Sequence, residues 1–184
     1  YRQSMKMNQQ AQSALGIALC HGHFGDLFLK EGETEKAIAQ YEKAYQMKGQ
    51  IDTWHWLNSC LALAKVYISR HQHQPALDLL AQAEKASYEG KAMDHLADVH
   101  ALYYEIHLCT GNATRALEAY KQSCIYRDSI VNHEKMLVLQ NERARYEYER
   151  RQGEIDSIRA DYEREKRIRN IFALVIGVIV ALAV

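Results

Sequence analysis

Apolar side chains recur at intervals of three to four residues through the first two thirds of the chain. This spacing places them on one face of a helix and predicts an all-α protein. The pattern is interrupted around Gly32, His71 and Gly111, where short polar stretches predict turns between helices. Pro75 follows the second of these turns, at a place that suits the first turn of a helix.

The helical pattern repeats along the chain in one register. Stretches that start at Gly25, Ala64 and Tyr104 align, so that equivalent positions are 39 and then 40 residues apart. Small residues at fixed places allow two antiparallel helices to approach closely, and a large residue nearby fills the space beside them. The residues that we expect to pack the repeats are Gly25, Gly32, Ala37, Tyr41, Ala44, Ala76, Leu80, Ala83, Gly111, Ala116 and Tyr120.

This pattern resembles the tetratricopeptide repeat (TPR), a helix–turn–helix unit. The first repeat matches best, and the second and third are weaker because His71 stands at a turn glycine and Tyr104 at a small position. The resemblance implies an α-solenoid of antiparallel helix pairs over residues 8–127. Residues 1–7 resemble 41–47 and 120–126, so the chain is expected to start inside an earlier repeat.

Residues 128–170 are expected to form one long charged helix, because they contain ten basic and ten acidic side chains and no proline. A partial heptad pattern is compatible with a parallel coiled coil that would make a homodimer. Its two seams are formed by Asn141, Tyr148, Ile155 and Tyr162, and by Leu137, Ala144, Arg151 and Ile158. A single solvated helix held by charge pairs four residues apart is the alternative.

Residues 171–184 carry no charge and follow Lys166, Arg167 and Arg169. A membrane-spanning helix takes about 20 apolar residues. We therefore expect this segment to be the start of a truncated transmembrane helix, with the basic residues at the lipid headgroups.

The order of these parts resembles the membrane-bound TPR regulators of Bacteroidetes. That resemblance implies a periplasmic, partner-binding sensor or scaffold region, with a histidine kinase or helix-turn-helix output domain elsewhere in the protein. The alternative is a tail-anchored cytoplasmic TPR adaptor that recruits partner proteins. In TPR arrays the concave face binds protein or peptide partners, and here it would carry Leu19, Gly22, Asp26, Leu29, Asn58, Leu61, Lys65, Ile68, Asp98, Ala101, Glu105 and Leu108.

Trp54 and Trp56 form a second candidate contact for a partner. The four cysteines are widely spaced, which favours free thiols. Histidines two positions apart, as in the pairs 21/23 and 71/73, point to different faces of a helix, so we expect no metal site. The balance of 23 basic and 23 acidic residues gives no sign of direct contact with nucleic acid. No catalytic motif or cofactor-binding loop is present in the sequence, which favours a binding function over an enzymatic one.

Overall fold

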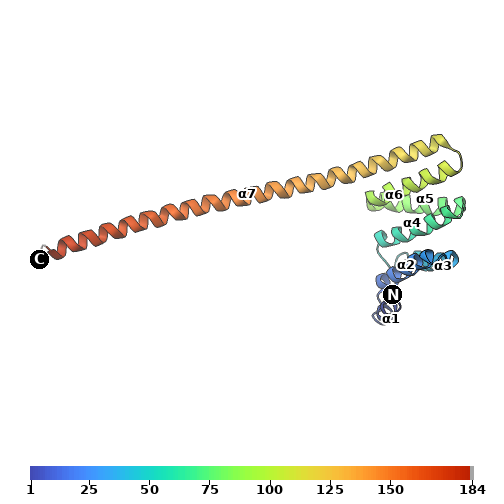
Figure 1. Ribbon diagram of the computed structural model, residues 1–184, viewed down its shortest axis with the longest axis horizontal. Coiled ribbons are helices and arrows are strands. Elements are labelled where there is room, and N and C mark those ends of the chain that lie inside the picture. Colours follow the sequence, from blue (N-terminus) through green and yellow to red (C-terminus); the bar gives the residue numbers. More distant parts are fainter. Residues whose placement is uncertain (183–184) are drawn as a thin grey trace. The chain divides into compact units, whose positions relative to one another are not determined.

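The computed structural model describes the backbone of residues 1–182 and the side chains of residues 1–172 and 176. Within this part of the chain all regular structure is helical, which confirms the predicted all-α fold (Figure 1). The helices are α1 (Arg2–Gln10), α2 (Ala14–Lys30), α3 (Thr34–Tyr45), α4 (Thr53–Ser69), α5 (His73–Gly90), α6 (Met93–Cys109) and α7 (Ala113–Leu182).

The chain divides into two compact units. The first is Tyr1–Asn132, and the second begins at His133. The sequence places this boundary after residue 127 with the helix continuing beyond it; α7 runs through that position without a turn, and the first unit extends to Asn132. The buried Ser123 hydroxyl donates to the Ala97 carbonyl of α6 at 2.9 Å, and the Tyr126 ring stacks on His100 of α6. The first part of α7 therefore belongs to the first unit.

The first unit consists of consecutive helix pairs that stack side by side (Figure 1). Helix α2 packs against α3, and α4 packs against α5. Helix α4 also contacts α3 of the preceding pair and α6 of the following pair, and these contacts join the pairs. Because α4 has neighbours on both sides, it contributes the largest set of buried residues among the helices α1–α6.

The turns inside the three pairs share one geometry. Gly32, His71 and Gly111 all adopt positive φ values, of 78°, 57° and 73°. In each case the next residue donates its N–H to a carbonyl five positions earlier, at 2.8–2.9 Å. This is the Schellman arrangement, which satisfies the last carbonyls of a helix and favours glycine at the left-handed position.

Small residues in the second helix of each pair lie in the core. Ala37, Ala76 and Ala116 are all buried, as are Ala44 and Ala83. Each lacks a side chain beyond Cβ, so the neighbouring helix can approach closely. The equivalent positions in the alignment thus occupy equivalent places in the structure.

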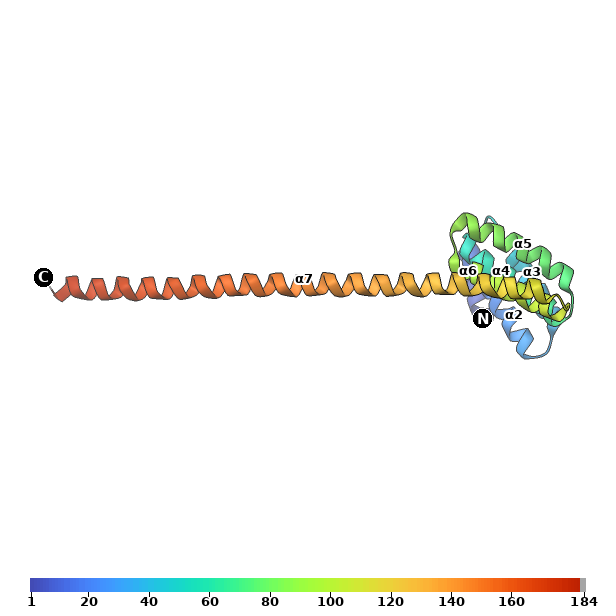
Figure 2. The same ribbon diagram turned by 90° about the horizontal axis from the view of Figure 1, so that it is seen from above.

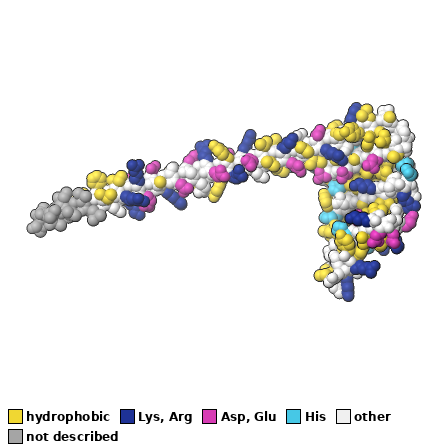
Figure 3. Space-filling view, viewed as in Figure 1, with side chains coloured by type: hydrophobic (Ala, Val, Ile, Leu, Met, Phe, Trp, Pro, Cys, Tyr) yellow, Lys and Arg dark blue, Asp and Glu magenta, His cyan; other side chains and the backbone are white. Residues whose placement is uncertain are grey.

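Within the described residues the second unit is a single helix, which continues without a break to Leu182 (Figure 2); the sequence predicts such a helix for residues 128–170. Over the part of the helix that Figure 3 colours by type, apolar, acidic and basic side chains are mixed. Arg145 and Arg150 each pair with a glutamate four residues later, at 3.7 and 3.0 Å. Such exposed pairs contribute about 0.3–0.5 kcal/mol each. The apolar seam residues Tyr148 and Ile158 are exposed.

For the predicted membrane segment, 171–184, the structure describes the helical backbone as far as residue 182 and, of the side chains, only those of 171, 172 and 176. Among the helical residues that are described, none of the helices combines the length and the apolar character that a membrane crossing requires.

Candidate functional site

An open groove runs between α2 and α4 in the first unit and encloses about 290 Å³. Helix α2 supplies one wall, α4 supplies the other, and the buried Tyr41 of α3 lies at the base. The lining residues are Ala18, Leu19, Gly22, His23, Asp26, Tyr41, Trp54, His55, Asn58, Ser59 and Ala62.

On the α2 wall the main polar group is the carboxylate of Asp26. The Tyr41 hydroxyl donates a hydrogen bond to it at 2.6 Å. Burial, and secondarily this hydrogen bond, raise the pKa of the Tyr41 phenol. Tyr41 therefore stays neutral and acts as a fixed donor to one oxygen of Asp26. The other oxygen lies 3.9 Å from His23 Nδ1, and the Asp26 side chain remains largely exposed.

The same tyrosine explains why Gly25 precedes Asp26. A Cβ added at Gly25 would lie 2.5 Å from Cε1 of the Tyr41 ring. Only a residue without a side chain lets the ring lie flat against α2 and reach Asp26. Packing of the helix pair and placement of the carboxylate thus depend on one contact.

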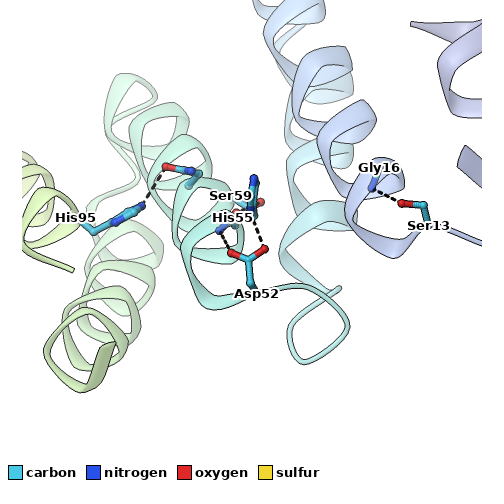
Figure 4. A network of polar contacts seen from close by, with 7 residues as sticks. Ser13, Gly16, Asp52, His55, Ser59 and His95 are labelled. Carbon is cyan, nitrogen blue, oxygen red and sulfur yellow. Dashed lines mark hydrogen bonds and ion pairs between the residues drawn. The ribbon is translucent and has the colours of Figure 1, made fainter. Parts of the chain in front are cut away.

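On the α4 wall, Asp52 caps the helix. Its carboxylate accepts from the His55 backbone N–H at 3.1 Å and lies 2.7 Å from His55 Nδ1 (Figure 4). The backbone hydrogen bond lowers the pKa of the Asp52 carboxyl. This cap fixes the first turn of α4, which carries Trp54 and His55 to the groove.

Trp54 is held between two histidine rings. Its ring meets His55 at a centroid distance of 5.0 Å and His95 of α6 at 5.4 Å, both edge to face. His95 is buried, and its Nε2 lies 3.1 Å from Asn58 Oδ1. Burial lowers the pKa of His95. The indole is thus oriented before any ligand arrives, although 53% of Trp54 remains exposed.

The structure separates the predicted partner-binding residues into three groups. Leu19, Gly22, Asp26, Asn58 and Trp54 come together in the groove. Six others lie away from this groove. Ala101 is half-buried, and the exposed ones are Leu29, Lys65, Asp98, Glu105 and Leu108. Buried in the core, and so closed to a partner, are Trp56, Leu61 and Ile68.

Burial of Trp56, Leu61 and Ile68 has a physical cause. Helix α4 is covered by helices on two sides, so its apolar stripe is wider than that of an outer helix. The Trp56 indole N–H donates to the Tyr45 carbonyl at 3.1 Å, which satisfies its polar atom inside the core. The two tryptophans therefore differ: Trp54 lines the groove and Trp56 packs the core.

Sequence reasoning missed Ala18, His23, His55, Ser59 and Ala62 as lining residues and placed Tyr41 only in the packing of the repeats. The signal is present in helix geometry, because residues three and four apart lie on one face. His23 follows Leu19 by four positions, and Ala62 follows Asn58 by four. His55 precedes Asn58 by three positions and Ser59 by four, so the same rule places it on this face.

Other candidate chemistry does not gather into a site within the described part of the chain. No group of three or more histidine, cysteine, aspartate or glutamate side chains could hold a metal ion there. His21 instead pairs with Gln40, with Nδ1 2.8 Å from Oε1. The four cysteines are free, and burial raises the pKa of the Cys60 thiol to about 12. An unreactive thiol at this position serves packing.

Comparison with protein-family models, with curated proteins and with solved structures gave no match to this chain.

Proposed function

We propose that the first unit is an array of TPR-type repeats that binds a segment of a partner protein, within a membrane-anchored signalling regulator similar to those of Bacteroidetes. The supporting features are the recurring helix pairs, their shared turn geometry and the groove between α2 and α4. A groove of this kind suits an extended or helical peptide better than a small reacting substrate, because it is open along one side.

The observation that carries this proposal is the pairing of an exposed indole with a held carboxylate in one groove. Trp54 and Asp26 lie on opposite walls, and none of the lining residues described here is a lysine or an arginine. Indole faces attract cations by about 0.5–2 kcal/mol, depending on desolvation. Hydrogen bonds to a charged group contribute about 1.5–3 kcal/mol. A lysine or arginine side chain of the partner is the ligand group that fits both.

A selection experiment with peptides of random sequence tests this proposal. A displayed library of short peptides is selected on the full chain, and in parallel on the W54A/D26N double variant. We expect peptides enriched on the wild-type chain to contain a basic residue beside apolar ones. The double variant should not enrich them. Equal enrichment on both proteins, or enrichment of acidic peptides, contradicts the proposal.

A signalling role also requires that the groove be linked to a second element. We propose that the charged helix of residues 128–170 pairs in parallel with a second copy, and that residues 171–184 enter the membrane. Tyr148, Ile155 and Tyr162 are exposed on this helix and available for such a seam. Flotation with lipid vesicles tests the anchor: the full chain should float, and a chain ending at residue 170 should stay in the soluble fraction.

A further inference from the structure

The third helix pair differs from the first two in one respect, which is the exposure of its outer face. Tyr41 and Leu80 are 3% and 0% exposed, whereas the equivalent Tyr120 is 53% exposed. Ile38 is 7% exposed and the equivalent Leu117 is 54% exposed. The same repeat position is therefore core in the first pair and surface in the third.

The cause lies in the next segment of the chain after each pair. After α3 the chain turns and α4 packs against it, and after α5 it turns again and α6 packs against it. After the start of α7 no turn occurs, and the helix continues instead. Within the described residues no helix takes the place that α4 and α6 take beside their predecessors. The outer face of the third pair therefore carries apolar residues at the positions that a following helix covers in the first two pairs, but no described helix covers them.

A local substitution reinforces the difference. The Tyr41 ring lies against Gly25, but the position equivalent to Gly25 in the third pair is Tyr104. Tyr104 and Tyr120 lie beside one another, with ring centroids 5.6 Å apart. With Tyr104 in the place that Gly25 leaves open for Tyr41, Tyr120 is not enclosed by its own pair and stays 53% exposed.

Apolar residues form a strip along the first part of α7, in which Leu117, Tyr120 and Val131 are exposed and Cys124 is half-buried. Leu117, Tyr120, Cys124 and Val131 are three, four and seven positions apart, so they share one face of the helix. Hydrophobic side chains gather over this part of the first unit in Figure 3. Contiguous exposed apolar surface of this kind marks an interaction site in a stable protein. We call these four residues the terminal strip.

We infer that a second copy of the chain covers the terminal strip, with α7 packed against α7 of the partner copy in parallel. Arg127 and Asp128 lie on the helix turn between Cys124 and Val131. Because they are consecutive, their side chains lie about 100° apart around the helix axis. Two parallel copies place equal residue numbers at one height. Arg127 of each copy then meets Asp128 of the other, while the apolar residues pair with themselves.

Charge pattern favours this occupant over an unrelated helix. A two-fold contact must be self-complementary, because the same patch serves both partners. Along the helix, the apolar residues of the strip lie on both sides of one positive residue, Arg127, and one negative residue, Asp128. A uniformly acidic partner helix would place a negative charge opposite Asp128, and a uniformly basic one would place a positive charge opposite Arg127.

Disulfide cross-linking of the full chain in a mild non-ionic detergent tests the inference. Cys124 lies within the strip, Cys20 and Cys60 are buried, and the exposed Cys109 is removed as C109S. Mild oxidation of C109S should give a covalent dimer on a non-reducing gel, because pairing of the two terminal strips brings the two Cys124 side chains together. Disulfide formation requires Cβ atoms within about 4.5 Å, so distant thiols react little.

The matched control moves the thiol around the same helix. In C109S/C124S/E118C the cysteine replaces the exposed Glu118, which lies about 120° from the centre of the strip on an ideal helix. We expect about tenfold less dimer from this variant, given the narrow geometry of a disulfide. A monomer by sedimentation equilibrium overturns the inference, and so does a dimer in which the two variants cross-link equally. The W54A/D26N variant should cross-link normally through Cys124, so loss of peptide binding and loss of self-association are separable.

Discussion

At the scale of single residues, the contact between Gly25 and Tyr41 joins packing to the groove. A Cβ at residue 25 would meet three ring atoms of Tyr41 at 2.5–2.8 Å. The ring cannot move aside easily, because it is buried and its hydroxyl is bound to Asp26 at 2.6 Å. Separating α2 from α3 would therefore disturb both the packing of the core and the position of the Asp26 carboxylate.

We therefore expect G25A to destabilise the first unit. Overpacking costs about 1–3 kcal/mol, and this exceeds the gain of about 1 kcal/mol from replacing glycine by alanine in a helix. The control is G22A on the same helix, where an added Cβ meets nothing within 4 Å. Urea unfolding should show a lower midpoint for G25A and an unchanged or higher one for G22A. The reverse order would show that Tyr41 is not held as described.

Buried histidines make the stability of the first unit depend on pH. Burial lowers the pKa of both His95 and His100. The unfolded chain, whose histidines titrate near about pH 6.5, therefore binds more protons than the folded chain as the pH falls through that value. The stabilisation is complete above the unfolded pKa and declines below it.

The free energy of unfolding should accordingly fall between about pH 7 and about pH 5. In H95Q the slope should become smaller, because one of the two buried imidazoles is gone, although His100 preserves part of it. Denaturant unfolding at a series of pH values measures this slope. An H95Q protein with the wild-type slope would show that His95 is accessible to protons in the folded state.

At the scale of elements, the three turns inside the helix pairs share one hydrogen bond pattern but differ in the residue at their left-handed position. Gly32 and Gly111 adopt positive φ without cost, but His71 adopts a φ of 57° with a side chain present. A residue with a Cβ in this region costs about 1–2 kcal/mol. The turn between α4 and α5 is therefore the strained member of the set.

Replacing the histidine should relieve this strain. H71G is expected to stabilise the protein by about 0.5–1 kcal/mol, after the greater flexibility of glycine in the unfolded chain is subtracted. The mirror variant G111A should destabilise it by a similar amount. Thermal unfolding followed by circular dichroism gives both values. A lower melting temperature for H71G would mean that the His71 side chain makes a stabilising contact.

Helix α4 offers a second comparison, between two tryptophans that are two positions apart. Trp56 is 2% exposed and donates a hydrogen bond to the Tyr45 carbonyl. Its replacement by alanine should cost about 3–5 kcal/mol. W54A should change the free energy of unfolding by about 0.5 kcal/mol or less, as surface substitutions do. Similar losses in the two variants would place Trp54 in the core rather than in the groove.

The helices and their turns could be predicted from the sequence because local rules determine them. Apolar spacing indicates a helix, and Gly32 and Gly111 mark the ends of helices. The groove could be predicted only in part. Repeat alignment places Leu61 and Ile68 on the concave face, yet both are buried. The number of sides on which α4 is covered depends on tertiary packing, which spacing along one helix does not report.

At the scale of the whole molecule, the first unit carries two kinds of surface. One is the groove, with Trp54 and Asp26 on its walls, and the other is the terminal strip of α7. Because one unit would carry both a partner-binding groove and a self-association face, ligand binding in the groove could change the structure of the dimer. Such coupling requires that the ligand bind two states with different affinity.

The most direct test of basic-residue recognition by the groove is a double-mutant cycle between Asp26 and the basic residue of a selected peptide. Affinities are measured by titration calorimetry for the wild-type chain and D26N, each with the peptide and with a version carrying leucine in place of the basic residue. We predict a coupling energy of about 1 kcal/mol or more, because each change removes the same interaction. Effects of the two changes that simply add would contradict recognition of a basic side chain by Asp26.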